Sequence, residues 1–151
     1  MAIDIKSTST GTVGELFIAA KLLSLGIEVA KPYVDCVGVD LVAISNDFRT
    51  AVPIQVKTAM SERQIRFERN WFTIPEIVLV WVWWFEAKCF IFDGQSDVER
   101  FLDTSAATLS WQRDGRWHIS STDFGPSHMN RLMQFENAWN KISNRLGSGT
   151  P

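Results

Sequence analysis

The chain has 151 residues, of which 46% are hydrophobic and 21% are charged, and its formal net charge is −2. The composition excludes an intrinsically disordered chain, and the net charge excludes a polycation that coats nucleic acid. A basic patch on one face stays compatible with this charge. The length suits one domain, so we expect residues 1–151 to form a single domain. Within it we expect a loose N-terminal arm over 1–10 and a flexible tail over 147–151.

The cysteines and the apolar segments bear on the cellular location of the protein. Cys36 and Cys89 form no Cys-x-x-Cys pair, which argues against a disulfide scaffold and a zinc module and suits a reducing compartment. The first residues lack the apolar run of a signal peptide. The charge-free stretch 77–85 is too short to cross a bilayer, which takes about 20 apolar residues. We therefore expect a cytoplasmic protein with no membrane partner.

The first half of the chain predicts one helix followed by three strands. Apolar residues at helical spacing indicate a helix over 13–25, with Thr12 as its cap, Glu15 at the capping-box position and Gly26 as its end. After this glycine the apolar period changes to that of strands. The expected strands are 27–34, 39–44 and 51–57, and Asn46-Asp47 is a turn signal between the last two.

The second half predicts two further strands, a hairpin and two helices. The polar residues 60–73 are interpreted as a loop, and Asp114-Gly115 is the strongest hairpin signal in the chain. Pro126 is expected to open the last helix. The predicted elements are strands at 77–85 and 88–92, a helix capped by Ser96, a hairpin of 109–112 with 117–120, and a helix at 126–144. This order is typical of a mixed α/β domain built on one central sheet.

The hairpin of the second and third strands brings polar residues together. If its turn is centred between Asp47 and Phe48, residues whose numbers add up to 95 lie opposite one another, and Asp40 faces Gln55. Gln55 and Lys57 share a face because side chains alternate along a strand. We therefore expect a carboxylate, an amide and an ammonium to converge on one side of the sheet.

These residue types fit a site for a hard divalent cation. Mg²⁺ takes oxygen ligands, so Asp40, the Gln55 side chain and the backbone carbonyl of Val56 are the candidate ligands. Lys57 would position the attacking water, and Glu15 could hold a second ion or a water. Such a site performs metal-assisted phosphodiester hydrolysis. The plain alternatives are a solvated strand face for Gln55 and Lys57 and a simple capping role for Glu15.

The same residues resemble a known family. Glu15, the run Gly38-Val39-Asp40-Leu41-Val42 and the run Ile54-Gln55-Val56-Lys57 resemble the PD-(D/E)XK nuclease superfamily, over roughly residues 11–59. By this resemblance Asp40 is the motif aspartate, Gln55 stands at the D/E position, Lys57 is the lysine and Glu15 is the first-helix glutamate. The sequence departs from the pattern at Val39, which replaces proline, and at Gln55, which replaces an acid. The Gln-x-Lys form resembles a variant found in some active members, including homing endonucleases.

The resemblance implies a restriction-endonuclease-like α/β fold, with a three-layer core and a mixed central β-sheet flanked by helices. It also implies a Mg²⁺-dependent endodeoxyribonuclease in which Mn²⁺ can substitute. A basic set is expected to contact DNA phosphates, with solvated surface charge as the alternative: Lys31, Arg49, Arg63, Arg66 and Arg69. Cleavage of both strands needs two active sites, so we expect a homodimer or higher homo-oligomer. The rival interpretation is a catalytically inactive module that binds DNA or a protein partner.

Overall fold

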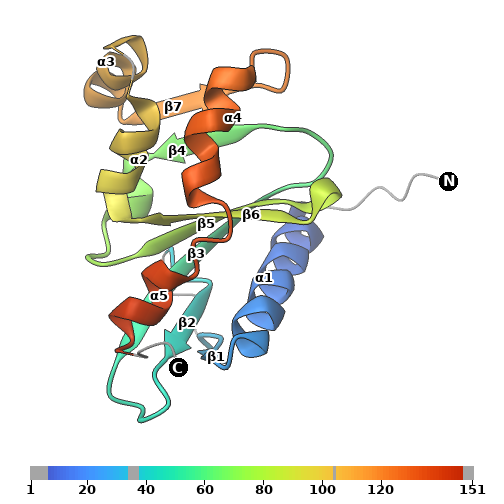
Figure 1. Ribbon diagram of the computed structural model, residues 1–151, viewed down its shortest axis with the longest axis vertical. Coiled ribbons are helices and arrows are strands. Elements are labelled where there is room, and N and C mark those ends of the chain that lie inside the picture. The colour runs from blue at the N-terminus through green and yellow to red at the C-terminus, as the bar shows by residue number, and fades with distance from the viewer. Residues whose placement is uncertain (1–6, 34–37, 104, 148–151) are drawn as a thin grey trace, which may run out of the picture.

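A five-stranded mixed sheet forms the centre of the protein (Figure 1). The computed structural model describes residues 7–33, 38–103 and 105–147. The strand order is β1-β2-β3-β5-β6, in which β3 and β5 are parallel and the other neighbours are antiparallel. The strands are β1 (Glu28–Ala30), β2 (Leu41–Ile44), β3 (Ala51–Ala59), β5 (Val78–Trp83) and β6 (Lys88–Asp93).

Helices and a separate two-stranded ribbon surround this sheet. The ribbon consists of β4 (Ile65–Glu68) and β7 (Arg116–Ile119). The α-helices are α1 (Ser7–Ser24), α2 (Gly94–Leu102), α3 (Ser105–Asp114), α4 (Pro126–Leu132) and α5 (Asn140–Arg145). The 3₁₀ helices are η1 (Arg69–Phe72), η2 (Trp84–Glu86) and η3 (Met133–Phe135). No helix in the described ranges is long and apolar enough to cross a membrane.

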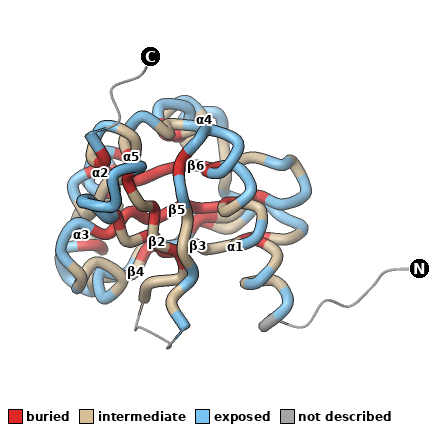
Figure 2. Tube along the Cα trace, turned by 90° about the horizontal axis from the view of Figure 1, so that it is seen from below, coloured by how far each residue is buried: buried red, intermediate tan, exposed pale blue. Residues whose placement is uncertain are grey.

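Side-chain alternation along the central strands divides the core into two clusters. In β5, Val78, Val80 and Val82 belong to the cluster that contains Ile18 of α1 and Ile142 of α5. The intervening residues of β5 pack in a second cluster with side chains from α2, α3 and α4: Leu79, Trp81 and Trp83. Burial is greatest in these central strands (Figure 2). The fold therefore has three layers, as predicted, with the sheet in the middle.

The N-terminal helix starts earlier than the sequence predicts. α1 begins at Ser7, so Thr12 lies inside the helix and is not its cap, and residues 7–10 are not a loose arm. Residues 1–6 and 148–151, which make up most of the predicted arm and tail, lie outside the described ranges. The capping signal was wrong because capping residues are only local preferences, and packing of α1 against the sheet outweighs them. Contacts of α1 with β3 carry that packing.

The predicted hairpin around Asp114-Gly115 is wrong. Residues 109–112 belong to α3, and β7 pairs with β4 from the segment that was predicted to be a loop. Gly115, at φ 64°, donates its N–H to the Trp111 carbonyl at 2.9 Å and so ends the helix. A left-handed glycine serves a helix end and a hairpin turn equally well, which is why the local signal misled.

Two predicted helices differ in detail. The predicted helix 126–144 is interrupted, because Asn137, at φ 52°, donates its N–H to the Cys89 carbonyl at 3.0 Å and Glu136 forms a bridge with Phe90. Pairing with β6 thus outweighs continuation of the helix. Helix α2 begins at Gly94, so Ser96 lies inside its first turn and is not its cap. Cys89 is a free, buried thiol whose pKa burial raises to about 11, and Cys36 lies outside the described residues.

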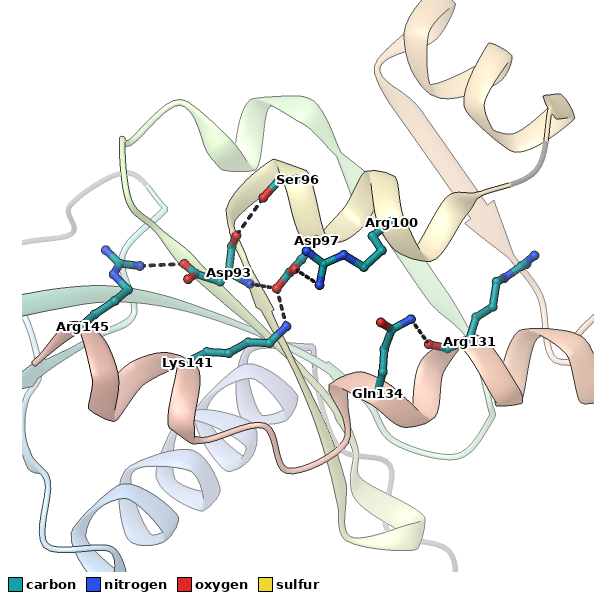
Figure 3. A network of polar contacts seen from close by, with 8 residues as sticks. All are labelled: Asp93, Ser96, Asp97, Arg100, Arg131, Gln134, Lys141 and Arg145. Atoms are coloured by element: carbon teal, nitrogen blue, oxygen red, sulfur yellow. Dashed lines mark hydrogen bonds and ion pairs between the residues drawn. The ribbon is translucent and has the colours of Figure 1, made fainter. Parts of the chain in front are cut away.

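A charged network fastens α5 to α2 and β6 (Figure 3). Asp97 is only 4% exposed, and it accepts hydrogen bonds from the Asp93 backbone N–H at 2.7 Å and from Lys141 of α5. Arg145 pairs with Asp93 at 3.0 Å. A buried carboxylate is tolerated only when it is paired in this way, so the network fixes where the C-terminal helix docks.

Candidate active site

The turn between β2 and β3 sets the register of the site. Ser45 Oγ donates to Asp47 Oδ1 at 2.6 Å and accepts from the Thr50 N–H at 3.0 Å, which closes a tight turn around Phe48 at φ 58°. The paired residues Leu41 with Ile54 and Ile44 with Ala51 follow the predicted register. The sequence-based register is therefore confirmed for the hairpin.

Asp40 lies one residue before β2 and is held against β3. Its N–H donates to the Ile54 carbonyl at 2.9 Å, and its carboxylate Oδ2 accepts the Val56 N–H at 2.7 Å. The other oxygen, Oδ1, makes no hydrogen bond to any described residue. Asp40 is thus fixed beside Gln55 and Val56 with one carboxylate oxygen left for a ligand.

Electrostatics link Asp40 to three other predicted residues. Burial raises the pKa of Asp40, and the Val56 hydrogen bond opposes that rise. The Glu15 carboxylate raises the pKa further, while Lys57 and Lys31 lower it. The charges of Glu15, Lys57 and Lys31 therefore act on Asp40, and the balance penalises the Asp40 anion. A divalent cation would relieve the repulsion between the two carboxylates.

Gln55 supplies an oxygen that has no partner. Its side chain is 6% exposed, and Oε1 is buried without a hydrogen bond from any described residue. A buried acceptor costs free energy until a water or a ligand satisfies it, so this oxygen is available to a bound ion. Gly38, at φ 80°, lies against this side chain, and a Cβ on it would fall 3.6 Å from Gln55 Nε2. Glycine permits this left-handed backbone conformation at position 38.

Glu15 reaches the site because α1 packs closely on β3. The preceding residue, Gly14, touches Thr58 of β3. Glu15 forms an ion pair with Lys31, which follows β1, and its side chain is 18% exposed. The charge of the predicted first-helix glutamate therefore acts on Asp40, and one of the predicted DNA-binding cations is the ion-pair partner of this glutamate.

Lys57 lies over the ring of Trp71, a contact that the sequence did not predict. Its Nζ is 4.8 Å from the centroid of the Trp71 ring, and Trp71 stacks on Trp81 at a centroid distance of 6.5 Å. Trp81 is the register partner of Lys57 across β3 and β5. Nothing in the sequence distinguished Trp71 except its position in the polar segment 60–73.

The structure separates the predicted DNA-binding arginines. Arg66 lies 5.6 Å from the Trp71 ring and so adjoins the site. Arg63 pairs with Glu86 at 2.6 Å, and Arg69 donates to the Trp111 carbonyl at the end of α3. Arg49 lies at the opposite end of the β2–β3 hairpin from Asp40 and is 85% exposed. Only Arg66 of these four is therefore next to Lys57.

The donor set is small for a metal centre. The part of the chain that the structure describes contains no group of three or more His, Cys, Asp and Glu side chains that could hold a metal ion. Mg²⁺ keeps several waters and needs only one or two carboxylates, so this set still suits it. Asp40, the unpartnered Gln55 oxygen and the Val56 carbonyl are oxygen donors of the type that Mg²⁺ prefers.

Two solved structures resemble the whole chain. The bacterial homing endonuclease I-Ssp6803I matches with a TM-score of 0.61 and 16% sequence identity, over 95% of each chain. Hjc from Archaeoglobus fulgidus, a Holliday junction resolvase, matches with a TM-score of 0.53 and 16% identity, over 93% of this chain and 98% of that chain. The chain has the restriction-endonuclease-like fold.

The predicted fold class is therefore confirmed. The sequence matches no protein-family model and no curated protein. A likeness at 16% identity establishes the fold, whereas function has to be argued from the site.

Proposed function

We propose that the protein is a metal-dependent endodeoxyribonuclease that hydrolyses phosphodiester bonds in DNA with Mg²⁺ or Mn²⁺. The observation that carries the proposal is the unpartnered Gln55 Oε1, buried beside the Asp40 carboxylate. The names of the two structural neighbours, a homing endonuclease and a Holliday junction resolvase, support a nuclease activity on this fold. The Gln-x-Lys arrangement supplies one amide oxygen where an acidic motif has two carboxylate oxygens, and it carries one negative charge fewer.

The cation would be held by Asp40, Gln55 and the backbone carbonyl of Val56. When bound, it would supply positive charge next to the scissile phosphate. The Val56 N–H keeps Asp40 in place by binding Oδ2 and leaves Oδ1 for the ion. Residues 55 and 56 of β3 would thus both orient Asp40 and supply the remaining protein ligands.

Lys57 would position the attacking water and stabilise the phosphate. Its Nζ can donate hydrogen bonds to the water and to a non-bridging phosphate oxygen, and it lies on the Trp71 ring, which limits its freedom. Glu15, held by Lys31, would support the site by accepting a hydrogen bond from the water. Arg66, whose guanidinium lies 5.6 Å from the centroid of the Trp71 ring, would contact DNA beside the site.

The assembly and location of the protein are also proposals. One site of this kind cuts one strand, so we infer a homodimer or higher homo-oligomer for cleavage of a duplex. Light scattering of the purified protein tests this inference directly. A cytoplasmic location agrees with the DNA substrate and with the free thiol of Cys89.

A catalytically inactive DNA- or protein-binding module is the second candidate. The ion pair between Glu15 and Lys31 favours it, because the glutamate already has a cationic partner. The neutral Gln55 favours it as well, since it lowers the negative charge available to a metal.

Cleavage of supercoiled plasmid in Mg²⁺ and in Mn²⁺ tests the proposal. We expect nicking or linearisation by the natural sequence and a loss of about a hundredfold or more for Lys57→Ala. Lys21→Ala, which removes a cation from α1, is the matched control and should cleave normally. Equal cleavage by the natural protein and Lys57→Ala would contradict the assigned role. Inactivity of both on plasmid and on branched DNA would favour the binding module.

A further inference from the structure

The ribbon of β4 and β7 has one apolar and one polar face. Ile65, Phe67 and Ile119 are buried in the second core cluster, and Trp117 packs against it. The alternate residues point the other way, and in the antiparallel register Arg66 faces His118 while Glu68 faces Arg116. Four polar side chains thus stand side by side on the outer face: Arg66, Glu68, Arg116 and His118.

This outer face borders a hollow with a volume of about 670 Å³. All four outer-face side chains line it, and Ser110 and Asp114 of α3 form another wall. Arg116 and His118 are exposed, and neither makes a side-chain hydrogen bond or ion pair with any described residue. The face therefore presents donors whose partners lie outside the protein fold.

The charge of this region differs from that of the whole chain. The hollow and the smaller one beside it are lined by four arginines and two acids: Arg66, Arg69, Arg113, Arg116, Glu68 and Asp114. The chain as a whole carries −2. A local excess of cations on an acidic protein is complementary to a polyanion such as DNA.

We propose that the outer face of the β4–β7 ribbon reads base edges in the major groove of duplex DNA, beside the cleavage site. This inference rests on the proposed nuclease function and deepens it. The major groove admits a two-stranded ribbon, and its base pairs offer both acceptors and donors. Arg66 and Arg116 suit guanine, and Glu68 can accept from the amino group of cytosine.

The mixture of charges distinguishes base reading from phosphate binding. A surface that only tracks phosphates is made of cations, and carboxylates on it would be repelled. Here Glu68 pairs with Arg66 at 3.4 Å, and Asp114 pairs with Arg113 at 2.7 Å. Such pairs orient a guanidinium, and the carboxylates add acceptors that base amino groups can use and phosphates cannot.

Trp71 contacts both the ribbon and the candidate active site. Arg66 of β4 lies over Trp71 at 5.6 Å, and Lys57 lies over the same ring at 4.8 Å. Bases read by the ribbon would therefore be close to the phosphate that is cleaved. This arrangement would let one small domain combine recognition and cleavage.

Selection of bound sequences from a randomised duplex library tests the inference. The protein is presented with the library in Ca²⁺ instead of Mg²⁺, and the retained DNA is sequenced. We expect the natural protein to enrich a defined motif, and Arg116→Ala and Glu68→Ala to lose discrimination at one or two adjacent base pairs by about tenfold. Lys21→Ala, on the opposite side of the sheet, should retain the motif. Circular dichroism verifies that each exposed-face variant is folded.

The same variants, assayed for nicking of plasmid in Mn²⁺, separate the two hypotheses. A changed motif, together with a much smaller loss of nicking than Lys57→Ala causes, is the expected result. If the ribbon variants enrich the same motif as the natural protein, or the natural protein enriches none, the ribbon does not read bases and the inference is overturned. A motif that depends on Arg116, found in a protein that cleaves no DNA, would support the inference and contradict the nuclease proposal.

Discussion

Gly14 of α1 lies so close to Thr58 of β3 that a Cβ on Gly14 would fall 1.8 Å from Thr58 Oγ1. The contact sits between two candidate site residues, since Glu15 follows Gly14 and Lys57 precedes Thr58. The absence of a side chain at Gly14 therefore determines how near the first-helix glutamate comes to the strand that carries Gln55 and Lys57. The distance between α1 and the sheet and the geometry of the site therefore both depend on the absence of a Cβ at Gly14.

Gly14→Ala should destabilise the fold and lower cleavage. Overpacking of this kind costs about 1–3 kcal/mol, to be measured by urea unfolding. Gly11→Ala is the matched control, because its Cβ would meet nothing nearer than Glu15 Oε1 at 3.9 Å, and alanine favours a helix by about 1 kcal/mol. Thr58→Ala should recover part of the loss in the double variant. Equal stabilities of Gly14→Ala and Gly11→Ala would show that the contact is not tight.

Asp40→Asn should raise stability without metal and remove the response to metal. Burial raises the pKa of Asp40, so the folded chain binds this proton at higher pH than the unfolded chain. The contribution of Asp40 to the free energy of unfolding is therefore complete at pH values below its pKa in the unfolded chain. This contribution is lost as the pH rises through the pKa of Asp40 in the folded chain. At neutral pH in EDTA, asparagine avoids this loss and can still accept the Val56 N–H.

Thermal unfolding measures both effects. The natural protein should gain about 2.7 kcal/mol at a metal concentration of 100 Kd, whereas Asp40→Asn should gain nothing. An identical shift of Tm in Mn²⁺ for the two proteins would place the ion elsewhere. A lower Tm for the variant in EDTA would contradict the assigned cost of the buried carboxylate.

Trp71→Ala should lower the cleavage rate by about tenfold while leaving the fold intact. Trp71 is half-buried, so its removal frees the Lys57 ammonium from its place over the ring. Trp71→Phe keeps an aromatic face and should recover most of the activity. Comparison of kcat with KM distinguishes the roles, because loss of positioning lowers kcat. A change in KM alone would assign Trp71 to DNA binding only.

Asp97→Ala should destabilise the fold by about 2–4 kcal/mol, because it leaves the ammonium of Lys141 unpaired. The Lys141 side chain is only 18% exposed, so water compensates little for the lost partner. Arg100→Ala removes another partner of the same carboxylate, but Arg100 is 61% exposed, and this control should cost less than about 1 kcal/mol. Urea unfolding compares the two. Similar losses would mean that Asp97 acts on α2 alone and does not fasten α5.

Local sequence signals were sufficient to predict the register of the β2–β3 hairpin, and hence that Asp40 and Gln55 are neighbours. The turn is closed by hydrogen bonds among Ser45, Asp47 and Thr50, all within six residues, and alternation then fixes the face of each side chain. Such local interactions are encoded in contiguous sequence. For this reason the pairing that brings Asp40 next to Gln55 could be predicted.

The surroundings of the site depend on contacts between distant segments of the chain. Pairing of β4 with β7 joins segments about fifty residues apart, and it alone places Arg116 and His118 beside Arg66. The partner of Glu15 and the ring over Lys57 were likewise unpredictable. These contacts depend on how the apolar faces of distant elements pack into one core, and no local pattern specifies that choice.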